Sequence, residues 1–348
     1  MAKKNRSKTL IFLLIILLAL GLAVAWFVYG LIYKNNVELG GQKSTYIYIR
    51  TGASYSEVLD TLYKRKLIIN HVSFEQVAKK KKYPSLVHPG KYKITEGMSN
   101  NALVNELRSG EQEPVKITFN NIRKKEELAG KLGEKLEPDS AHLLEAINDE
   151  DLLGKYGFNR ENALALFIPN TYSMYWNTTP ADFMARMAKE YKNFWNDERK
   201  EKAKALNMTQ TQVMVLASIV DRETQSENDK PIIAGVYINR LKKNMPLEAD
   251  PTLIWAANDF TIKRVLNIHK QIESPYNTYK HTGLPPGPIC IPAVSSIDGV
   301  LDYTKHNYLY FCAKEDLSGG SCFAATYEEH MKNAHKYQDA LNKRNILK

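Results

Sequence analysis

The longest apolar run in the chain extends from Leu10 to Tyr33 and contains no charged residue. A helix of that length crosses a bilayer. Four basic residues between positions 3 and 8 precede it, and by the positive-inside rule they keep the N-terminus cytoplasmic. Cleavage as a signal peptide after Ala23-Val24-Ala25 is the alternative, but the apolar run continues well past that point. We expect a cytoplasmic tail at 1–8, a transmembrane helix at 9–33 in the plasma membrane, and an extracytoplasmic remainder.

The next eighty residues alternate between strand and helix patterns. Residues 34–45 are mostly polar with paired glycines and predict a short linker. Strands are expected at 46–49, 90–94 and 115–119, and helices at 55–67, 73–80 and 100–107. Ser54 and Glu57 have the spacing of a capping box before the first helix. The pattern predicts a small α+β module at 46–118.

The remainder, 119–348, is mostly helical with a few strands. Apolar residues recur at three- and four-residue spacing over 125–135, 138–148 and 180–197. Pro169 interrupts this helical pattern at 167–172. Further helices are expected at 211–223, 231–243 and 328–341, with a β-hairpin around 308–326. The predicted fold class is therefore α+β: one membrane helix, a small module and a larger mixed α+β domain.

The net charge of the chain excludes fewer possible functions than the membrane segment does. The 348 residues carry a formal net charge of +10, which attracts nucleic acid, anionic lipid or an acidic polymer by the same physics. The lysine run at 79–82 fits a solvated helix end, or else a polymer-binding patch. An extracytoplasmic location argues against a role on DNA.

The three cysteines do not suggest a metal site. No C-x-x-C pair or His-rich cluster accompanies them, so we expect no metal. Cys312 and Cys322 flank the predicted hairpin, and either a disulfide or two free thiols would fit. Cys290 is expected to be a buried small hydrophobe.

The stretch Thr211–Glu223, TQVMVLASIVDRE, carries the candidate chemistry. Apolar residues occupy all sides of the expected helix, which predicts that the helix is buried in the domain. Glu223 continues the stripe of Leu216 and Ile219, whereas Asp221 points roughly opposite. A carboxyl group held there is partly desolvated, and desolvation raises its pKa toward the range that a general acid needs. The alternative is a Glu223 that only pairs with an arginine or a helix end.

Two downstream segments offer polar groups for a binding groove. Tyr276-Asn277-Thr278-Tyr279 provides hydroxyl and amide groups of the kind that orient sugars. It leads into Gly283-Leu284-Pro285-Pro286-Gly287-Pro288, a stiff loop of fixed path that suits a groove wall or a structural crossover.

Five motifs in order, LASIVDRET, VYINRL, MPLEADPT, YNTYKHTGLPPGPI and YLYF, resemble the YceG-like family, the endolytic murein transglycosylases. The stretch HPGKYKITEGMSNNALVNELRSG is similar to that family's LysM-like region, which places a LysM-like module at 46–118 and the catalytic domain at 119–348. The resemblance implies that Glu223 is the catalytic glutamate and that Asp221 and Arg240 support it. It also implies a set of substrate-binding residues: Asn239, Asp250, Thr252, Asn277 and Tyr279.

The resemblance further implies a lytic transglycosylase that acts on peptidoglycan glycan strands without cofactor or metal. Glu223 would protonate the oxygen linking MurNAc to GlcNAc, then accept a proton from the MurNAc C6 hydroxyl, which closes on C1 and leaves a 1,6-anhydro end. Asn277 or Tyr279 would stabilise the oxocarbenium-like charge. Peptidoglycan synthases are candidate partners.

The chain departs from the family pattern at three places that concern accessory subsites more than Glu223. It has Ile168-Pro169-Asn170-Thr171-Tyr172 where an aspartate is usual at the third position, Leu164-Ala165 in place of an acidic-glycine pair, and Ser321 where a histidine often stands. Two alternatives stay open: a non-catalytic peptidoglycan-binding or assembly protein, and a two-carboxylate muramidase that uses Glu223 with Asp250 or Asp221.

Overall fold

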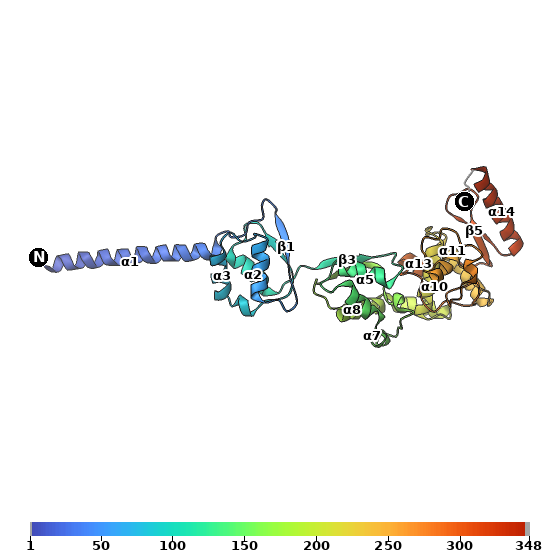
Figure 1. The fold of residues 1–348 in the computed structure, drawn as a ribbon, viewed down its shortest axis with the longest axis horizontal. Helices are drawn as coiled ribbons and strands as arrows, with labels where there is room; N and C mark the ends of the chain where they lie inside the picture. Colours follow the sequence, from blue (N-terminus) through green and yellow to red (C-terminus); the bar gives the residue numbers. More distant parts are fainter. Residues whose placement is uncertain (1, 345–348) are drawn as a thin grey trace. The chain divides into compact units, whose positions relative to one another are not determined.

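The computed structural model describes residues 2–344 and divides into two compact units (Figure 1). Unit 1 comprises the chain up to Val115 together with Ser173–Thr178, and unit 2 comprises Lys116–Tyr172 together with the chain from Thr179 onward. Each unit mixes helices with short two-stranded sheets, so the fold is α+β.

Unit 1 begins with the long helix α1 (Ala2–Tyr33). Its portion Lys8–Tyr33 has a mean hydropathy of 3.0 and is long enough to cross a membrane. None of that window is buried against the rest of the protein, as a lipid-facing helix requires. The helix is therefore consistent with a single-pass membrane anchor.

The rest of unit 1 packs three helices against a two-stranded antiparallel sheet. Strands β1 (Ser44–Ile49) and β2 (Gly90–Thr95) place Ile47 opposite Tyr92, and both side chains are buried. The helices are α2 (Tyr55–Lys64), α3 (His71–Lys80) and α4 (Asn100–Ser109). The predicted capping box is confirmed: Ser54 accepts from the backbone of Glu57, and Glu57 accepts from the backbone of Ser54.

Part of the short linker predicted at residues 34–45 packs into the core of unit 1. Val37 and Leu39 are only 1% and 9% exposed and belong to the core of unit 1. The backbone N–H of Val37 donates to the carbonyl of Met98, and that of Ile69 donates to the carbonyl of Asn36. Two apolar residues at alternate positions in a polar segment are enough to draw it into the core.

A chain of three asparagines ties the end of α1 to α3 and α4. Buried Asn36 donates to Oδ1 of Asn100 at 2.6 Å and to the carbonyl of Asn70 at 3.0 Å. Asn100 in turn donates to the carbonyl of Leu31 at 2.8 Å and to Oγ of Ser73 at 3.0 Å. The last carbonyl groups of a helix have no hydrogen-bond partner within the helix. The bond from Asn100 therefore gives the Leu31 carbonyl, near the end of α1, a partner from outside the helix.

The first part of unit 2 contains five helices and most of the strands β3 (Val115–Phe119) and β4 (Asn170–Met174), which pair with each other. Phe119 stacks on Tyr172 and meets Phe167 edge to face. The predicted helix 180–197 ends at Phe194, because Asn196 caps a new helix by accepting from the backbone of Arg199. The helices are α5 (Lys125–Gly133), α6 (Ser140–Asn148), α7 (Glu150–Gly154), α8 (Pro180–Phe194) and α9 (Asp197–Ala205).

The centre of unit 2 is α10 (Gln210–Glu223), whose residues from Val213 to Asp221 are all buried. It packs against α11 (Lys230–Lys242), α12 (Asp250–Ala257) and α13 (Val294–Leu301). The predicted hairpin is confirmed as β5 (Tyr310–Ala313) and β6 (Ser321–Ala324), and α14 (Tyr327–Lys343) packs on it. A buried helix enclosed by these elements is what its apolar sequence predicts.

We predict that Asn100→Ala loosens the junction between α1 and the rest of unit 1. The substitution leaves the Leu31 carbonyl and the Asn36 amide without their partner, and each buried unsatisfied group costs about 1–3 kcal/mol. Hydrogen exchange of the amides of Val37 and Ile69 should accelerate about 30-fold or more, since about 1.4 kcal/mol corresponds to a factor of ten. The neighbouring Asn101→Ala serves as control, and equal protection in both variants would contradict the prediction.

Candidate active site

The position of Glu223 follows from the helix that carries it. A capping box between Thr209 and Gln212 starts α10, and its buried residues hold it in the centre of unit 2. Glu223 is the last residue of this helix, and Thr224 has extended backbone. The helix therefore delivers one carboxyl group from the core to the wall of a cavity, where the side chain is half-buried.

The cavity has a volume of about 360 Å³ and is built from segments far apart in the sequence. Glu223 and Tyr237 come from α10 and α11, and the loop before α12 contributes Leu247 and Glu248. The C-terminal hairpin and α14 close another side. The remaining lining residues are Arg240, Asp250, Lys270, Tyr279, Tyr310, Phe311, Tyr327 and His330.

The carboxyl group of Glu223 has one strong polar partner. The hydroxyl of Tyr237 donates to its Oε1 at 2.6 Å. Burial raises the pKa of Glu223 to about 7; the Tyr237 bond opposes this rise, and the negative charge of Asp250 adds to it. Desolvation dominates, because removing water penalises the charged form of a carboxyl group. Glu223 can therefore hold a proton near neutral pH.

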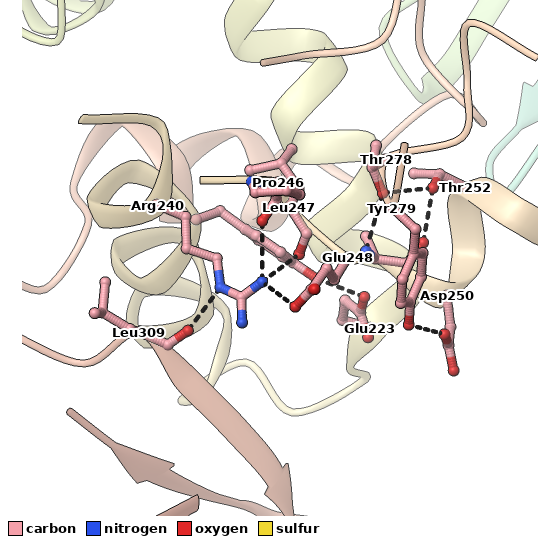
Figure 2. A network of polar contacts seen from close by, with 12 residues as sticks. Glu223, Arg240, Pro246, Leu247, Glu248, Asp250, Thr252, Thr278, Tyr279 and Leu309 are labelled. Carbon is pink, nitrogen blue, oxygen red and sulfur yellow. Dashed lines mark hydrogen bonds and ion pairs between the residues drawn. The ribbon is translucent and has the colours of Figure 1, made fainter. Parts of the chain in front are cut away.

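Asp250 and Tyr279 form a second pair in the same cavity. The Tyr279 hydroxyl donates to Oδ1 of Asp250 at 2.5 Å (Figure 2). Burial and this bond raise the pKa of Tyr279 well above its usual value, so the phenol stays protonated. The Lys270 ammonium lies 4.7 Å from the centre of the Tyr279 ring. The site thus holds a second carboxylate close enough to influence Glu223.

Arg240 lines the cavity, but most of its hydrogen bonds hold backbone segments together. It is 6% exposed, and its guanidinium donates to the carbonyls of Leu309, Pro246 and Leu247 at 2.7, 3.0 and 3.2 Å. It also pairs with Glu248 at 2.8 Å (Figure 2). A planar fork of donors suits this arrangement better than a lysine would. Arg240 thereby positions the 246–248 loop and the start of the hairpin around Glu223.

Three residues implied as substrate contacts do not line this cavity. Asn277 is 0% exposed, and its amide donates to the carbonyls of Lys270 and Ile272 at 3.0 and 2.8 Å. Thr252 is equally buried and bonds the hydroxyl of Thr278 at 2.8 Å. Asn239 donates to the carbonyl of His306 at 2.7 Å. Because their polar groups are used internally, these residues shape the loops around the site.

Asp221 faces away from Glu223, as the helical spacing predicts. Its Oδ1 accepts from the Ser296 hydroxyl at 2.6 Å and from the Ala293 backbone at 3.3 Å. These bonds join α10 to the start of α13, so Asp221 supports the packing of the helix that carries Glu223.

The cysteines lie outside the cavity and are all free thiols in the structure. Cys312 and Cys322 occupy directly opposite positions in the β5–β6 ladder, and of the two alternatives that the sequence left open, a disulfide or two free thiols, the structure has the free thiols. Burial raises the pKa of both thiols, which favours the neutral form. Cys290 is fully buried, as expected.

Sequence reasoning missed several residues of the cavity. Tyr237 stands in the VYINRL motif, and its spacing on α11 could have marked it as facing α10. His330 has a buried Nδ1 without a hydrogen-bond partner in the part of the chain that the structure describes. Burial lowers its pKa, with a further contribution from Arg240. The other missed residues are Glu248, Lys270, Tyr310, Phe311 and Tyr327.

Comparison with known proteins places this site in a family context. The chain is 29% identical to the endolytic murein transglycosylase of Bacillus subtilis over 333 residues, 91% of each protein. It is 27% identical to the endolytic murein transglycosylase of Streptococcus pneumoniae over an alignment of 371 residues, gaps included, which covers 96% of this chain and 66% of that protein.

A solved structure shares the fold. The crystal structure of a YceG-like protein from Listeria monocytogenes superposes with a TM-score of 0.58 at 24% identity, covering 83% of this chain and 98% of that one. The family model described as the YceG-like family matches residues 47–336. That range includes most of unit 1 beyond α1 and every residue of the cavity around Glu223, and the chain therefore belongs to the YceG-like family.

Proposed function

We propose that this protein is a membrane-anchored lytic transglycosylase that cuts peptidoglycan glycan strands between MurNAc and GlcNAc, with Glu223 as the catalytic acid and base. The observation that carries the proposal is a glutamate with a pKa raised to about 7 in the wall of an open cavity lined with tyrosines and charged groups. The relatives named as endolytic murein transglycosylases support the substrate and suggest cuts within strands.

The proposed reaction uses one carboxyl group in two roles. The Tyr237 hydroxyl donates to Oε1 of Glu223, which leaves Oε2 to carry the proton. That proton passes to the oxygen between MurNAc C1 and GlcNAc C4 as the bond to C1 breaks, and GlcNAc leaves with a free hydroxyl. The carboxylate then takes the proton of the MurNAc C6 hydroxyl while O6 bonds to C1. The product is a 1,6-anhydro end, and Glu223 regains its proton.

The positive charge that develops at C1 needs a negative neighbour. Asp250 lies in the same cavity, and its bond from Tyr279 fixes its orientation. We assign Asp250 the electrostatic role, because a fixed carboxylate stabilises an oxocarbenium-like charge without forming a bond to it. Tyr279 acts through Asp250, whereas buried Asn277 positions the loop that carries Tyr279: its Oδ1 accepts from the Tyr279 backbone at 3.0 Å.

The membrane helix defines where the reaction would take place. α1 anchors the chain, and the basic residues before it favour a cytoplasmic N-terminus. The part of unit 1 beyond α1 and the whole of unit 2 then face the extracytoplasmic cell wall. In this location the enzyme would shorten nascent glycan strands close to the membrane, beside the synthases that make them. The LysM-like part of unit 1 would contribute to binding the strand.

A muramidase is the second candidate, because Asp250 shares the cavity with Glu223 and could activate water or attack C1. Asp221 is unsuited to that role, since its carboxylate is buried on the opposite side of α10 and bonded to Ser296. The two reactions differ in their products: a muramidase leaves reducing ends. A non-catalytic binding protein would have no use for a glutamate whose pKa matches general-acid chemistry.

Replacement of Glu223 tests the proposal directly. Full-length protein in detergent should release 1,6-anhydro-muropeptides from uncrosslinked glycan strands, as measured by mass spectrometry. Glu223→Gln should lower the rate by about 100-fold or more, because loss of the acid and base removes at least that factor. Asp221→Asn serves as a control for the neighbouring carboxylate. Reducing ends from the wild type would favour the muramidase, and no products would favour the binding protein.

The pH profile tests the role of Tyr237. Because Glu223 must be protonated to start the reaction, kcat/KM should fall as pH rises through about 7. Tyr237→Phe removes the bond that stabilises the carboxylate, so the pKa of Glu223 should rise and the alkaline fall should move up by about one pH unit, the effect of one charge-assisted hydrogen bond. An unchanged profile, or a shift to lower pH, would contradict this assignment.

A further inference from the structure

Unit 2 contains a second cavity, of about 390 Å³, that none of the residues around Glu223 line. Its walls include Lys124, Lys125, Arg160, Trp255 and Tyr276, with Glu126 and Glu161 also present. A smaller cavity of about 60 Å³ shares Trp255 as a wall and is lined by Arg123, Arg222 and Phe260. The two cavities together combine aromatic surfaces with several cations.

Three aromatic rings form a continuous row through both cavities. The Trp255 ring centre lies 5.8 Å from that of Tyr276 and 6.1 Å from that of Phe260. Trp255 and Tyr276 are half-buried, so part of each ring is open to the cavity. Aromatic faces of this kind suit the apolar faces of sugar rings as well as the aliphatic part of peptides.

Three of the cations around these rings have no carboxylate partner within ion-pair distance in the described chain, whereas Arg160 pairs with Glu150 at 3.7 Å. Within residues 8–344, no carboxylate lies within 4.0 Å of the charged groups of Arg123, Lys124 or Arg222. Arg123 and Lys124 instead lie over the Phe260 ring, at 5.1 and 4.9 Å. Nearby Glu127 accepts from the Arg123 backbone at 3.0 Å and pairs with Lys131 at 3.6 Å.

The two guanidinium groups also repel each other. Burial lowers the pKa of Arg123, and the charge of Arg222 lowers it further. Nε of Arg222 is buried without a hydrogen-bond partner in the described chain. Cys290 offers no negative charge, because burial raises its pKa to about 12. Like charges held together around a buried, unpartnered donor are a favourable place for an anion.

The second cavity and the small one beside it share supporting helices with the cavity around Glu223. On α10, Arg222 directly precedes Glu223, and consecutive helical residues point about 100° apart. On α12, Asp250 lines the active site, whereas Trp255 lines the second cavity about 7.5 Å further along the axis. A substrate that extends beyond one sugar ring on either side of the cut can therefore reach both.

We propose that the second cavity, together with the small cavity beside it, binds a peptide side chain of the glycan strand. Lys124 of the second cavity and Arg123 and Arg222 of the small one hold the carboxylate of the peptide, and the groups next to that carboxylate rest on Trp255 and Tyr276. The inference rests on the proposed function, because it assumes a peptidoglycan substrate. When MurNAc carries its peptide, its own carboxyl group is part of an amide bond, so the glycan backbone of such a strand is neutral. The repeated carboxylates of the strand then belong to the peptides. The cavity would thus make the enzyme select strands that still carry acidic peptides.

The test compares two substrates with full-length protein in detergent: glycan strands with native peptides, and the same strands after their peptide carboxylates are converted to methylamides. Wild type should prefer native strands in kcat/KM by about tenfold, the equivalent of one or two charge-assisted hydrogen bonds. Arg123→Gln/Lys124→Gln should lose this preference, so that its kcat/KM on native and on amidated strands becomes equal. Lys189→Gln/Lys204→Gln, which removes the same charge from exposed sites of unit 2, should keep it.

Binding separates this inference from the proposed activity. Equilibrium binding of both substrates is measured in a Glu223→Gln background, where no cleavage is needed. The preference for native strands should again be about tenfold and depend on Arg123 and Lys124. If wild type cuts neither substrate but this preference is present, the activity is refuted and the peptide site stands. A wild type without preference, or a double variant that keeps it, would overturn the site. Nascent strands can also carry a lipid diphosphate, an anion that amidation does not remove. Equal binding of native and amidated strands would therefore show that the peptide carboxylate is not the anion that the site recognises.

Discussion

Burial of helix α10 is the constraint on which unit 2 depends. A helix that is apolar on all sides is stable only when other elements cover its whole circumference. In this protein α11, α12 and α13 provide that cover. The enclosure ends at the last turn, where Glu223 meets the cavity while still surrounded by protein on most sides. The desolvation that raises its pKa is therefore a consequence of how the helix is packed.

The walls of the active site are held by backbone contacts from polar side chains. Arg240 gathers three carbonyl oxygens from the 246–248 loop and the residue before the hairpin. Asn277 does the same for the segment that presents Tyr279. Buried polar groups of this type are costly unless every donor is satisfied, so they hold the loops in one arrangement. A rigid wall keeps Tyr237 and Asp250 in place around Glu223.

The same two helices present opposite chemistry on their two sides. One side carries two carboxyl groups, Glu223 and Asp250, which line the same cavity. The other carries Arg222 and Trp255 beside further cations and rings. The cavities therefore lie on the same two helices, α10 and α12. In unit 1, the hydrogen bonds of Asn36 and Asn100 join the end of α1 directly to the folded part of the unit.

The sequence by itself determined the local elements and the principal residue. Capping signals and apolar spacing marked most helices, and the stripe ending at Glu223 marked the carboxyl group that the structure places at the cavity, because period and burial are local properties of a helix. The sequence could not show that Asn239, Thr252 and Asn277 turn inward, since each is occupied by partners that only folding brings close. It also could not place Val37 and Leu39 in a core, or bring Tyr310 and His330 to Glu223. Asn277 bonds within its own loop, five to seven residues away. The other positions belong to tertiary structure, because they depend on contacts between segments tens to more than a hundred residues apart.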